Sequence, residues 1–195
     1  MHKAFISFIF IWILFALACN SPFIPKKKGY EKMDFPTHSY QIFNEAGYPY
    51  TFEYPIYAQI EHKINYFGDN AETKGWININ IPSYNATVFV SYKAILPHQF
   101  DTLVKDAYTF ANNHNSKANA IEDSVFTTQN GIHGVFFHIG GDVATNYQFF
   151  LTDSLHHFFR GALYFDTTPN EDSLAPANTF LFKDLTHLVN TFKWQ

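Results

Sequence analysis

The sequence predicts an α+β fold: a single antiparallel, meander-rich β-sheet of about six or seven strands, with two long amphipathic helices packed on it. Apolar and polar residues alternate, as they do in strands, in short segments on both sides of residues 97–111. Apolar residues recur with the helical period in residues 97–111 and 175–192. Tight connections join the strands predicted within residues 125–166, and they indicate antiparallel pairing because parallel strands need long crossovers.

The composition indicates one packed domain that does not bind nucleic acid. The chain has 195 residues, of which 19% are aromatic, a content typical of a β-rich core and not of a disordered chain. Its 13 basic and 17 acidic residues give a net charge of −4, which leaves no broad basic face for nucleic acid. Cys19 is the single cysteine, so the fold depends on its core and not on disulfides.

Residues 1–18 have the form of a signal peptide. Lys3 precedes an apolar run over residues 4–17, which is shorter than the roughly 20 residues of a membrane-spanning helix. The small residue Ala18 then precedes Cys19. This arrangement resembles a bacterial lipoprotein lipobox, which implies cleavage after Ala18 and a diacylglycerol on the thiol of Cys19. An ordinary secretory signal with an incidental thiol is the alternative.

The segment after the cleavage site is predicted to be a tether. Residues 19–29 form this lipidated tether and residues 30–195 a single domain. Pro22 and Pro25 favour an extended tether. The lysines at 26–28 keep it solvated, or lie against anionic head groups at about 1 kcal/mol each.

The first half of the domain is predicted to contain three strands and a loop. Residues 50–57 alternate as a strand, and Pro55 indicates an edge or a strand end. Residues 62–75 are polar and contain two glycines, which indicates a loop. Residues 76–81 and 86–95 are predicted to form a hairpin.

A helix is predicted next, opened by Pro97, which is well tolerated in a first turn. The polar residues 112–115 end it, and residues 117–122 are expected to add one more helical turn. Its apolar stripe consists of Phe100, Leu103, Val104, Ala107, Tyr108 and Ala111.

Four consecutive strands are then predicted, in residues 125–129, 132–139, 143–152 and 157–166. An Asn-Gly pair at 130–131 is the strongest two-residue hairpin signal in the chain. The last strand has a strongly apolar face, formed by Phe159, Leu163 and Phe165. The final helix is the nearest segment that can cover this face, and Asp172 with Ser173 is expected to cap its N-terminus.

Several segments, taken together, resemble one known family. They are Cys19, Lys28-Gly29-Tyr30, Tyr50 to Ala58, Trp76 to Asn80, Ala107 to His114, Gly140-Gly141, Gln148 to Phe165, Pro169 to Pro176 and Thr191 to Trp194. This combination resembles the gliding-motility lipoprotein GldD family over nearly the whole chain after residue 18. The order of elements also resembles small PsbP-like and Mog1-like α/β domains, an analogy of architecture that says little about function.

The family resemblance implies a role and partners. It implies a lipid-anchored lipoprotein of the cell envelope that is required for gliding motility and for the protein-secretion machinery coupled to it. The expected partners are the membrane and other proteins of those machineries. The resemblance brings no active site, so only Cys19 takes a role from it, as the lipid-bearing residue.

Ten histidines raise the question of a metal site. His133 and His138 are five residues apart on one predicted strand, and His156 and His157 are adjacent, so the members of each pair point to opposite faces. No His-x-x-x-His motif or cysteine partner accompanies them, so no metal or other cofactor is predicted.

Asp153, Ser154 and His157 raise the question of nucleophilic catalysis. No Gly-x-Ser-x-Gly elbow surrounds Ser154, and Asp-Ser pairs are ordinary in hairpin turns because both side chains bond nearby backbone groups. Turn structure is therefore the favoured interpretation, and no catalytic residue is predicted.

Arg160 and the early tyrosines are candidates for binding. Arg160 is the only arginine and shares a predicted strand face with Phe158 and Tyr164. A partly buried guanidinium pairs with a carboxylate or stacks on an aromatic ring, so a structural role is favoured over a binding role. Core packing is likewise favoured over a protein interface for Tyr48, Tyr50, Tyr54, Tyr57 and Tyr66.

Three hypotheses about function follow. The first is a non-enzymatic envelope lipoprotein, held to the inner or outer membrane by Cys19, whose domain faces the periplasm and assembles or stabilises the gliding and secretion machinery. The second is an envelope hydrolase that uses the turn from Asp153 to His157. The third is a small-ligand binding module that uses the aromatic sheet face and Arg160. The first is favoured.

Overall fold

The computed structural model describes residues 32–62 and 75–195 of the chain. The predicted signal peptide (1–18) and lipidated tether (19–29) lie outside the described residues, as do residues 63–74 of the predicted loop. Within the described part, neither helix has the length and apolar character needed to cross a bilayer.

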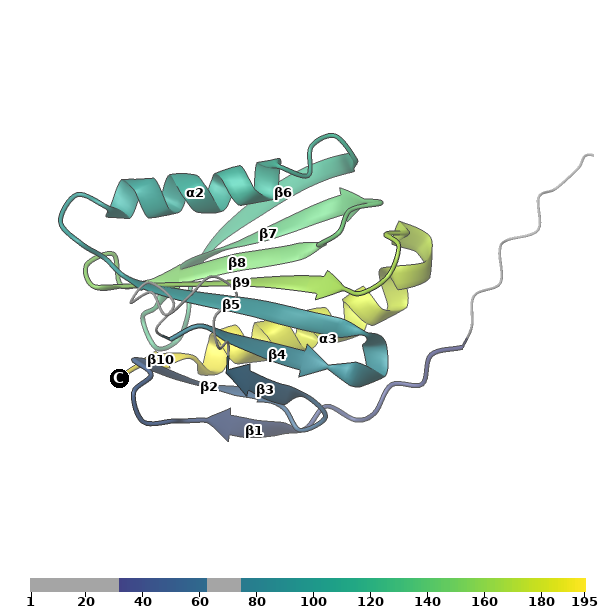
Figure 1. Ribbon diagram of the computed structural model, residues 1–195, viewed down its shortest axis with the longest axis horizontal. Helices are drawn as coiled ribbons and strands as arrows, with labels where there is room; N and C mark the ends of the chain where they lie inside the picture. The colour runs from purple at the N-terminus through teal and green to yellow at the C-terminus, as the bar shows by residue number, and fades with distance from the viewer. Residues whose placement is uncertain (1–31, 63–74) are drawn as a thin grey trace, which may run out of the picture. The chain divides into compact units, whose positions relative to one another are not determined.

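The strands of the described residues form two antiparallel sheets (Figure 1). The smaller sheet has the order β1-β2-β10 and consists of β1 (Tyr40–Phe43), β2 (Tyr50–Pro55) and β10 (Lys193–Trp194). The larger sheet has the order β3-β4-β5-β9-β8-β7-β6. It consists of β3 (Gln59–His62), β4 (Ile77–Ile81), β5 (Ala86–Ala94), β6 (Ala118–Thr127), β7 (His133–Gly141), β8 (Tyr147–Thr152) and β9 (His157–Phe165).

The prediction of a single sheet is therefore wrong. The strand predicted over residues 50–57 does not join the larger sheet, because β2 pairs with β1 on one side and with β10 on the other. Its aromatic residues Tyr50 and Phe52 pack on Phe159 of the larger sheet and on Phe192 after the last helix. An alternating strand can bury its apolar face at a sheet edge or in a second sheet, and the pattern does not distinguish these outcomes.

Two helices lie on opposite faces of the larger sheet. Helix α3 (Glu171–Thr191) crosses behind β4 and β5 in Figure 1, and α2 (Phe100–Asn112) lies over the other face. The predicted apolar face of β9, formed by Phe159, Leu163 and Phe165, belongs to the same core as the buried residues of α3, which confirms the expected cover. Phe158, on the opposite face of β9, belongs to the core beneath α2.

Both predicted hairpins form, but the second turn is longer than the two residues expected, since β6 ends at Thr127, β7 begins at His133, and only Gly131 of the Asn-Gly pair has a positive φ. β4 pairs with β5 across the 3-10 turn Pro82–Tyr84, and the next residue, Asn85, has a φ of 47°. β6 pairs with β7 across a turn in which Gly131 has a φ of 76°. Asparagine and glycine adopt such positive φ values more readily than other residues. The four strands from β6 to β9 are neighbours in the sheet, as predicted.

The first helix and the strand after it begin elsewhere than predicted. α2 begins at Phe100 and not at Pro97, because His98 has a φ of 66°, which a right-handed helix cannot contain. Residues 117–122 do not form a helical turn, since β6 begins at Ala118 and pairs with β7. The backbone hydrogen bonds of this long ladder outweigh a weak local helical preference.

Helix α3 begins earlier than predicted, and its cap is a different residue. The side chain of Asn170 accepts a hydrogen bond of 2.9 Å from the backbone N–H of Ser173. Asp172 and Ser173, predicted as the cap, lie in the first turn instead. Pro176 lies inside the helix, where its missing N–H leaves the carbonyl of Asp172 without its usual donor.

Candidate functional site

A cavity of about 230 Å³ lies between α2 and the strands β4, β5 and β9, and is here termed the α2 cavity. It forms because α2 packs on β7, β8 and part of β9, while β4 and β5 extend beyond the helix. Its lining residues are Trp76, Asn78, Phe89, Val90, Ser91, Lys93, Leu103, Asp106, Ala107, Phe110, Phe158 and Arg160. The cavity combines aromatic and aliphatic walls with a few polar groups, which is the usual character of a small-molecule site.

Arg160 lies in the wall of the α2 cavity. Its guanidinium carbon is 4.6 Å from the centroid of the Phe110 ring, and its Nη2 donates a hydrogen bond of 2.5 Å to Oε1 of Gln148. The predicted stacking of Arg160 on an aromatic ring is thus confirmed, and its hydrogen-bond partner is an amide instead of a carboxylate. Among residues 32–62 and 75–195, no acidic side chain forms an ion pair with this arginine. Burial lowers the pKa of Arg160 from its ordinary value.

Two buried amide side chains, one in the wall of the α2 cavity and one beside Arg160, have unsatisfied atoms within the described residues. Asn78 donates from Nδ2 to Glu61 at 3.3 Å, while its Oδ1 has no hydrogen-bond partner. Gln148, which accepts from Arg160, has no partner for its Nε2. Buried polar atoms are satisfied in the great majority of cases, so the Oδ1 of Asn78, a residue of the cavity wall, is an exception that a bound group would satisfy.

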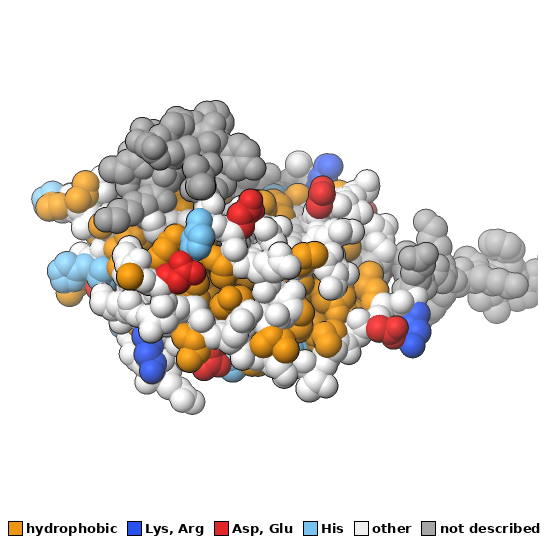
Figure 2. All heavy atoms as spheres, turned by 60° about the horizontal axis from the view of Figure 1, so that its bottom comes forward, with side chains coloured by type: hydrophobic (Ala, Val, Ile, Leu, Met, Phe, Trp, Pro, Cys, Tyr) orange, Lys and Arg blue, Asp and Glu red, His pale blue; other side chains and the backbone are white. Residues whose placement is uncertain are grey.

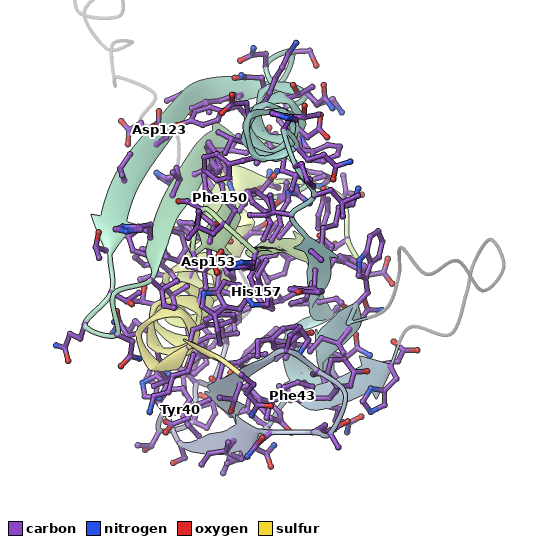
Figure 3. All side chains as sticks on the ribbon, turned by 90° about the vertical axis from the view of Figure 1, so that its left-hand side faces the viewer. Tyr40, Phe43, Asp123, Phe150, Asp153 and His157 are labelled. Carbon is purple, nitrogen blue, oxygen red and sulfur yellow. The ribbon has the colours of Figure 1, made fainter. Side chains whose placement is uncertain are left out.

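The turn between β8 and β9 contains the residues of the hydrolase hypothesis, and Figure 3 shows Asp153 and His157 close together there. Oδ1 of Asp153 accepts three backbone hydrogen bonds, from Leu155 at 3.0 Å and from His156 and His157 at 2.8 Å each. Partial burial raises the pKa of Asp153, but these hydrogen bonds and the charge of His157 outweigh it, so the pKa lies below its usual value. The carboxylate is thus engaged in holding the turn.

The other members of this turn also have structural partners. Ser154 has a φ of 66°, and its backbone N–H donates to the hydroxyl of Thr152 at 2.8 Å. Nδ1 of His157 lies 2.8 Å from the hydroxyl of Tyr92, and its ring stacks on Trp194 with centroids 4.9 Å apart. These contacts favour the turn interpretation over a catalytic triad.

The other histidines that were considered as metal ligands lie apart from one another. His133 has its Nδ1 3.0 Å from the hydroxyl of Thr127, and His138 stacks on Tyr147 with centroids 5.1 Å apart. His156 extends from the turn, 74% exposed. In the part of the chain that the structure describes, no three His, Cys, Asp or Glu side chains gather as they would around a metal ion.

A buried carboxylate on α3 forms a network that the sequence analysis missed. Asp184 is 4% exposed and accepts hydrogen bonds from Nδ1 of His38 at 2.7 Å, from the hydroxyl of Tyr40 at 3.1 Å and from the hydroxyl of Tyr57. Burial and the neighbouring Asp184 raise the pKa of Tyr40 to about 12. The signal in the sequence was an acidic residue in the apolar stripe of the helix, beside Leu185.

The Asp184 network continues to a second acid–histidine pair. The ring of Tyr40, which Figure 3 shows beside α3, stacks on His187 with centroids 3.5 Å apart. Nε2 of His187 lies 2.7 Å from Oε2 of Glu53 on β2. The network therefore joins the strands β1 and β2 to one face of α3, and its groups are used in fastening the small sheet.

The early tyrosines mostly contribute to the core. Tyr50 is fully buried and donates its hydroxyl hydrogen bond to the carbonyl of Gly75 at 2.5 Å. Tyr48, Tyr54 and Tyr57 are half-buried and pack against the core beneath α3. Core packing is therefore confirmed for these four, while Tyr66 lies outside the described residues.

Comparisons with known proteins identify a family. A cyanobacterial PsbP from Synechocystis sp. PCC 6803, solved in solution, is 9% identical, with a TM-score of 0.48 over 85% of this chain and 98% of that one. A search of curated proteins finds no match. The family model described as gliding motility lipoprotein GldD matches residues 20–194, nearly all of the chain. The chain therefore belongs to the GldD family and is a lipoprotein associated with gliding motility.

Proposed function

We propose that this protein is a non-enzymatic subunit that assembles or stabilises the gliding machinery and the protein-secretion machinery coupled to it. The observation that carries the proposal is the family match over residues 20–194. The described elements form a scaffold with two cores, one on each side of the larger sheet. Such a domain suits a protein that holds others in place, because it presents a rigid surface on several sides.

The proposed anchor is a lipid on Cys19, attached after cleavage behind Ala18. A lipoprotein family implies attachment to a membrane of the cell envelope, and the match begins at residue 20, directly after this cysteine. The domain would then face the periplasm, since the signal peptide exports the chain that follows it. Residues 20–39 would connect the lipid to β1.

The contacts of the candidate catalytic residues support the non-enzymatic part of the proposal. Asp153 is engaged by three backbone amides, and His157 by Tyr92 and Trp194. A general base must reach a proton of the substrate, and these groups already serve the turn. If a folded Asp153→Asn variant at normal abundance abolished motility through a lost hydrolytic activity, the envelope hydrolase would replace this proposal.

The small sheet offers one surface for partners. Figure 2 brings this side of the molecule forward and shows hydrophobic side chains distributed among polar ones, with basic side chains near the margins. Ile42 on β1 and Ile56 after β2 are 66% and 58% exposed. Exposed apolar side chains on a mixed polar surface are found in non-obligate protein interfaces.

The test is crosslinking in living cells with a tagged wild-type chain and a Cys19→Ala variant, followed by mass spectrometry of the captured proteins. An alkyne-tagged palmitate added to the culture reports lipidation in the same cells. We expect the wild type to take up the label and to capture motility and secretion proteins. The variant should lose both the label and the captured proteins.

Two results would contradict the proposal. If neither the wild type nor Cys19→Ala captured a motility or secretion protein, the assembly role would be excluded, independently of the lipid-labelling result. Equal labelling of wild type and Cys19→Ala would exclude this cysteine as the lipid site. Separation of inner and outer membranes from the labelled cells then assigns the membrane.

A further inference from the structure

We propose that the α2 cavity binds a small organic carboxylate, whose charged end lies on Arg160 and whose apolar body lies between Phe89 and Phe110. This site is independent of the proposed assembly role and rests only on the geometry of the cavity. A ligand of this class carries one carboxylate, a single ring or short chain, and a hydroxyl or amine at the far end.

The first observation is a half-buried cation without a counter-charge in the described residues. The guanidinium of Arg160 is held by a neutral amide oxygen on Gln148 and by the face of Phe110. The guanidinium has five N–H donors, and the bond to Gln148 engages only one of them. Removing a charge from water is costly unless an opposite charge accompanies it. A bound carboxylate would supply the negative charge that no described side chain pairs with Arg160.

The second observation is the apolar lining beside this cation. Phe89 on β5 and Phe110 on α2 are 39% and 46% exposed, although both line the cavity. Leu103 and Phe158 complete the apolar wall deeper in the cavity. At about 230 Å³ the cavity is smaller than the roughly 300–1,000 Å³ of drug-sized sites, so the ligand has the size of one ring.

The third observation is a hydrogen-bond acceptor at the other end of the cavity. Asn78 lies opposite Phe89 in the ladder of β4 and β5, and Phe89 lies opposite Ala162 on β9. Arg160 is two residues from Ala162, on the same face of β9. With strands about 4.8 Å apart and a rise of about 3.4 Å per residue, the Cα atoms of Asn78 and Arg160 are about 12 Å apart.

This separation fits a ligand with two polar ends. Asn78 lines the cavity and its Oδ1 has no hydrogen-bond partner within the described residues, so in the proposed complex this oxygen would accept a hydrogen bond from the ligand. Asn78 and Arg160 both line the cavity, and a para-substituted ring would fill the span between them above Phe89. The basic lining residues Arg160 and Lys93 outnumber the single acid, Asp106, which favours an anion over a cation.

The experiment is binding of 4-hydroxybenzoate to the full mature chain in detergent, measured by ligand-observed NMR. Benzoate lacks the far hydroxyl, and 4-hydroxybenzyl alcohol lacks the charge. We expect 4-hydroxybenzoate to bind with a dissociation constant on the order of 0.1–1 mM. The alcohol should bind at least about tenfold more weakly, because it loses the charge-assisted hydrogen bonds.

Three variants locate the binding. Arg160→Gln keeps hydrogen-bond donors but removes the charge, and should weaken 4-hydroxybenzoate at least about tenfold while leaving the alcohol unchanged. Ser91→Leu keeps Arg160 but places a larger side chain in the cavity, and should abolish binding of all three compounds. Lys183→Gln removes the same charge from an exposed position on α3 and should change nothing. Circular dichroism checks that each variant is folded.

Several outcomes overturn the proposal. Absence of binding to the wild type at millimolar concentration rejects the site itself. Equal binding by the carboxylate and the alcohol, or by wild type and folded Arg160→Gln, rejects the role of the arginine. Unchanged binding to folded Ser91→Leu places the ligand elsewhere. Tighter binding of phenyl phosphate than of 4-hydroxybenzoate replaces the carboxylate by a phosphate as the ligand class.

Discussion

Replacement of Asp184 by alanine removes the acceptor shared by three side chains that are distant in sequence. His38, Tyr40 and Tyr57 all bond to this one carboxylate on α3. A hydrogen bond to a charged group contributes about 1.5–3 kcal/mol, so three of them set an upper limit. His38 and Tyr40 are half-buried and can turn toward water, so the expected loss is smaller, about 2–4 kcal/mol of unfolding free energy.

This loss converts into a measurable change of melting temperature. For a chain of this size, 1 kcal/mol shifts the melting temperature by about 2–4 °C, so Asp184→Ala should lower it by about 4–16 °C. The measurement is thermal unfolding followed by near-ultraviolet circular dichroism, which reports the packing of the aromatic rings. Asp166→Ala, at an exposed acid after β9, is the matched control and should change the stability by less than about 0.5 kcal/mol.

Two results would refute this reasoning. If Asp184→Ala melted at the same temperature as Asp166→Ala, the three hydrogen bonds would contribute nothing net to stability. If a double variant with Tyr57→Phe lost the full sum of the two single losses, the two groups would act independently. Coupling between Asp184 and Tyr57 is expected, because each single change already breaks their shared bond.

Three further predictions concern pH and packing. Tyr40, with a pKa raised to about 12, should stay protonated at pH 10 in spectrophotometric titration, and Asp184→Ala should lower that pKa. Because the folded-state pKa is raised, the stability that Tyr40 contributes is lost as pH rises from 10 toward 12. Asp153→Asn should lower the free energy of unfolding at pH 7 by about 1 kcal/mol relative to wild type, as measured by urea unfolding. Because the folded-state pKa of Asp153 is depressed, this difference should shrink as pH falls below 3.8, the ordinary pKa of an aspartate. Gly161→Ala should lower stability by about 1–3 kcal/mol, since its Cβ would overlap the ring of Phe149; unchanged urea midpoints would contradict it.

The elements that the sequence predicts well are those whose periodicity matches their burial. Each isoleucine of β4 at 77, 79 and 81 lies in the core beneath α3, as the alternation indicates. β1 and β3 were not predicted, because these strands have four residues each and are mostly exposed, so they carry little periodic signal. Whether β2 joins one sheet or another depends on the distant β10, which no local pattern reveals.

The α2 cavity and the Asp184 network show why sites are harder to predict than strands. The cavity joins β4, β5 and β9 to α2, and its shape depends on where the helix ends above the sheet. The sequence did single out Arg160, because a lone arginine among aromatic residues needs a partner. It could not identify Phe110 or Gln148 as those partners, since each lies on a different element.

The position of the Asp184 network gives it a role beyond stability if the chain is anchored as proposed. A domain held by a lipid on Cys19 receives any pull from the membrane through the residues that lead to β1. On that path Phe35 packs on Phe180 of α3 with ring centroids 4.7 Å apart, and His38 and Tyr40 bond to Asp184 on the same helix. Force on the tether is therefore transmitted to α3, which spans the core, and not to β1 alone. In the proposed subunit of the gliding machinery, the contacts of this segment with α3, the longer of the two described helices, would keep the small sheet from separating under load.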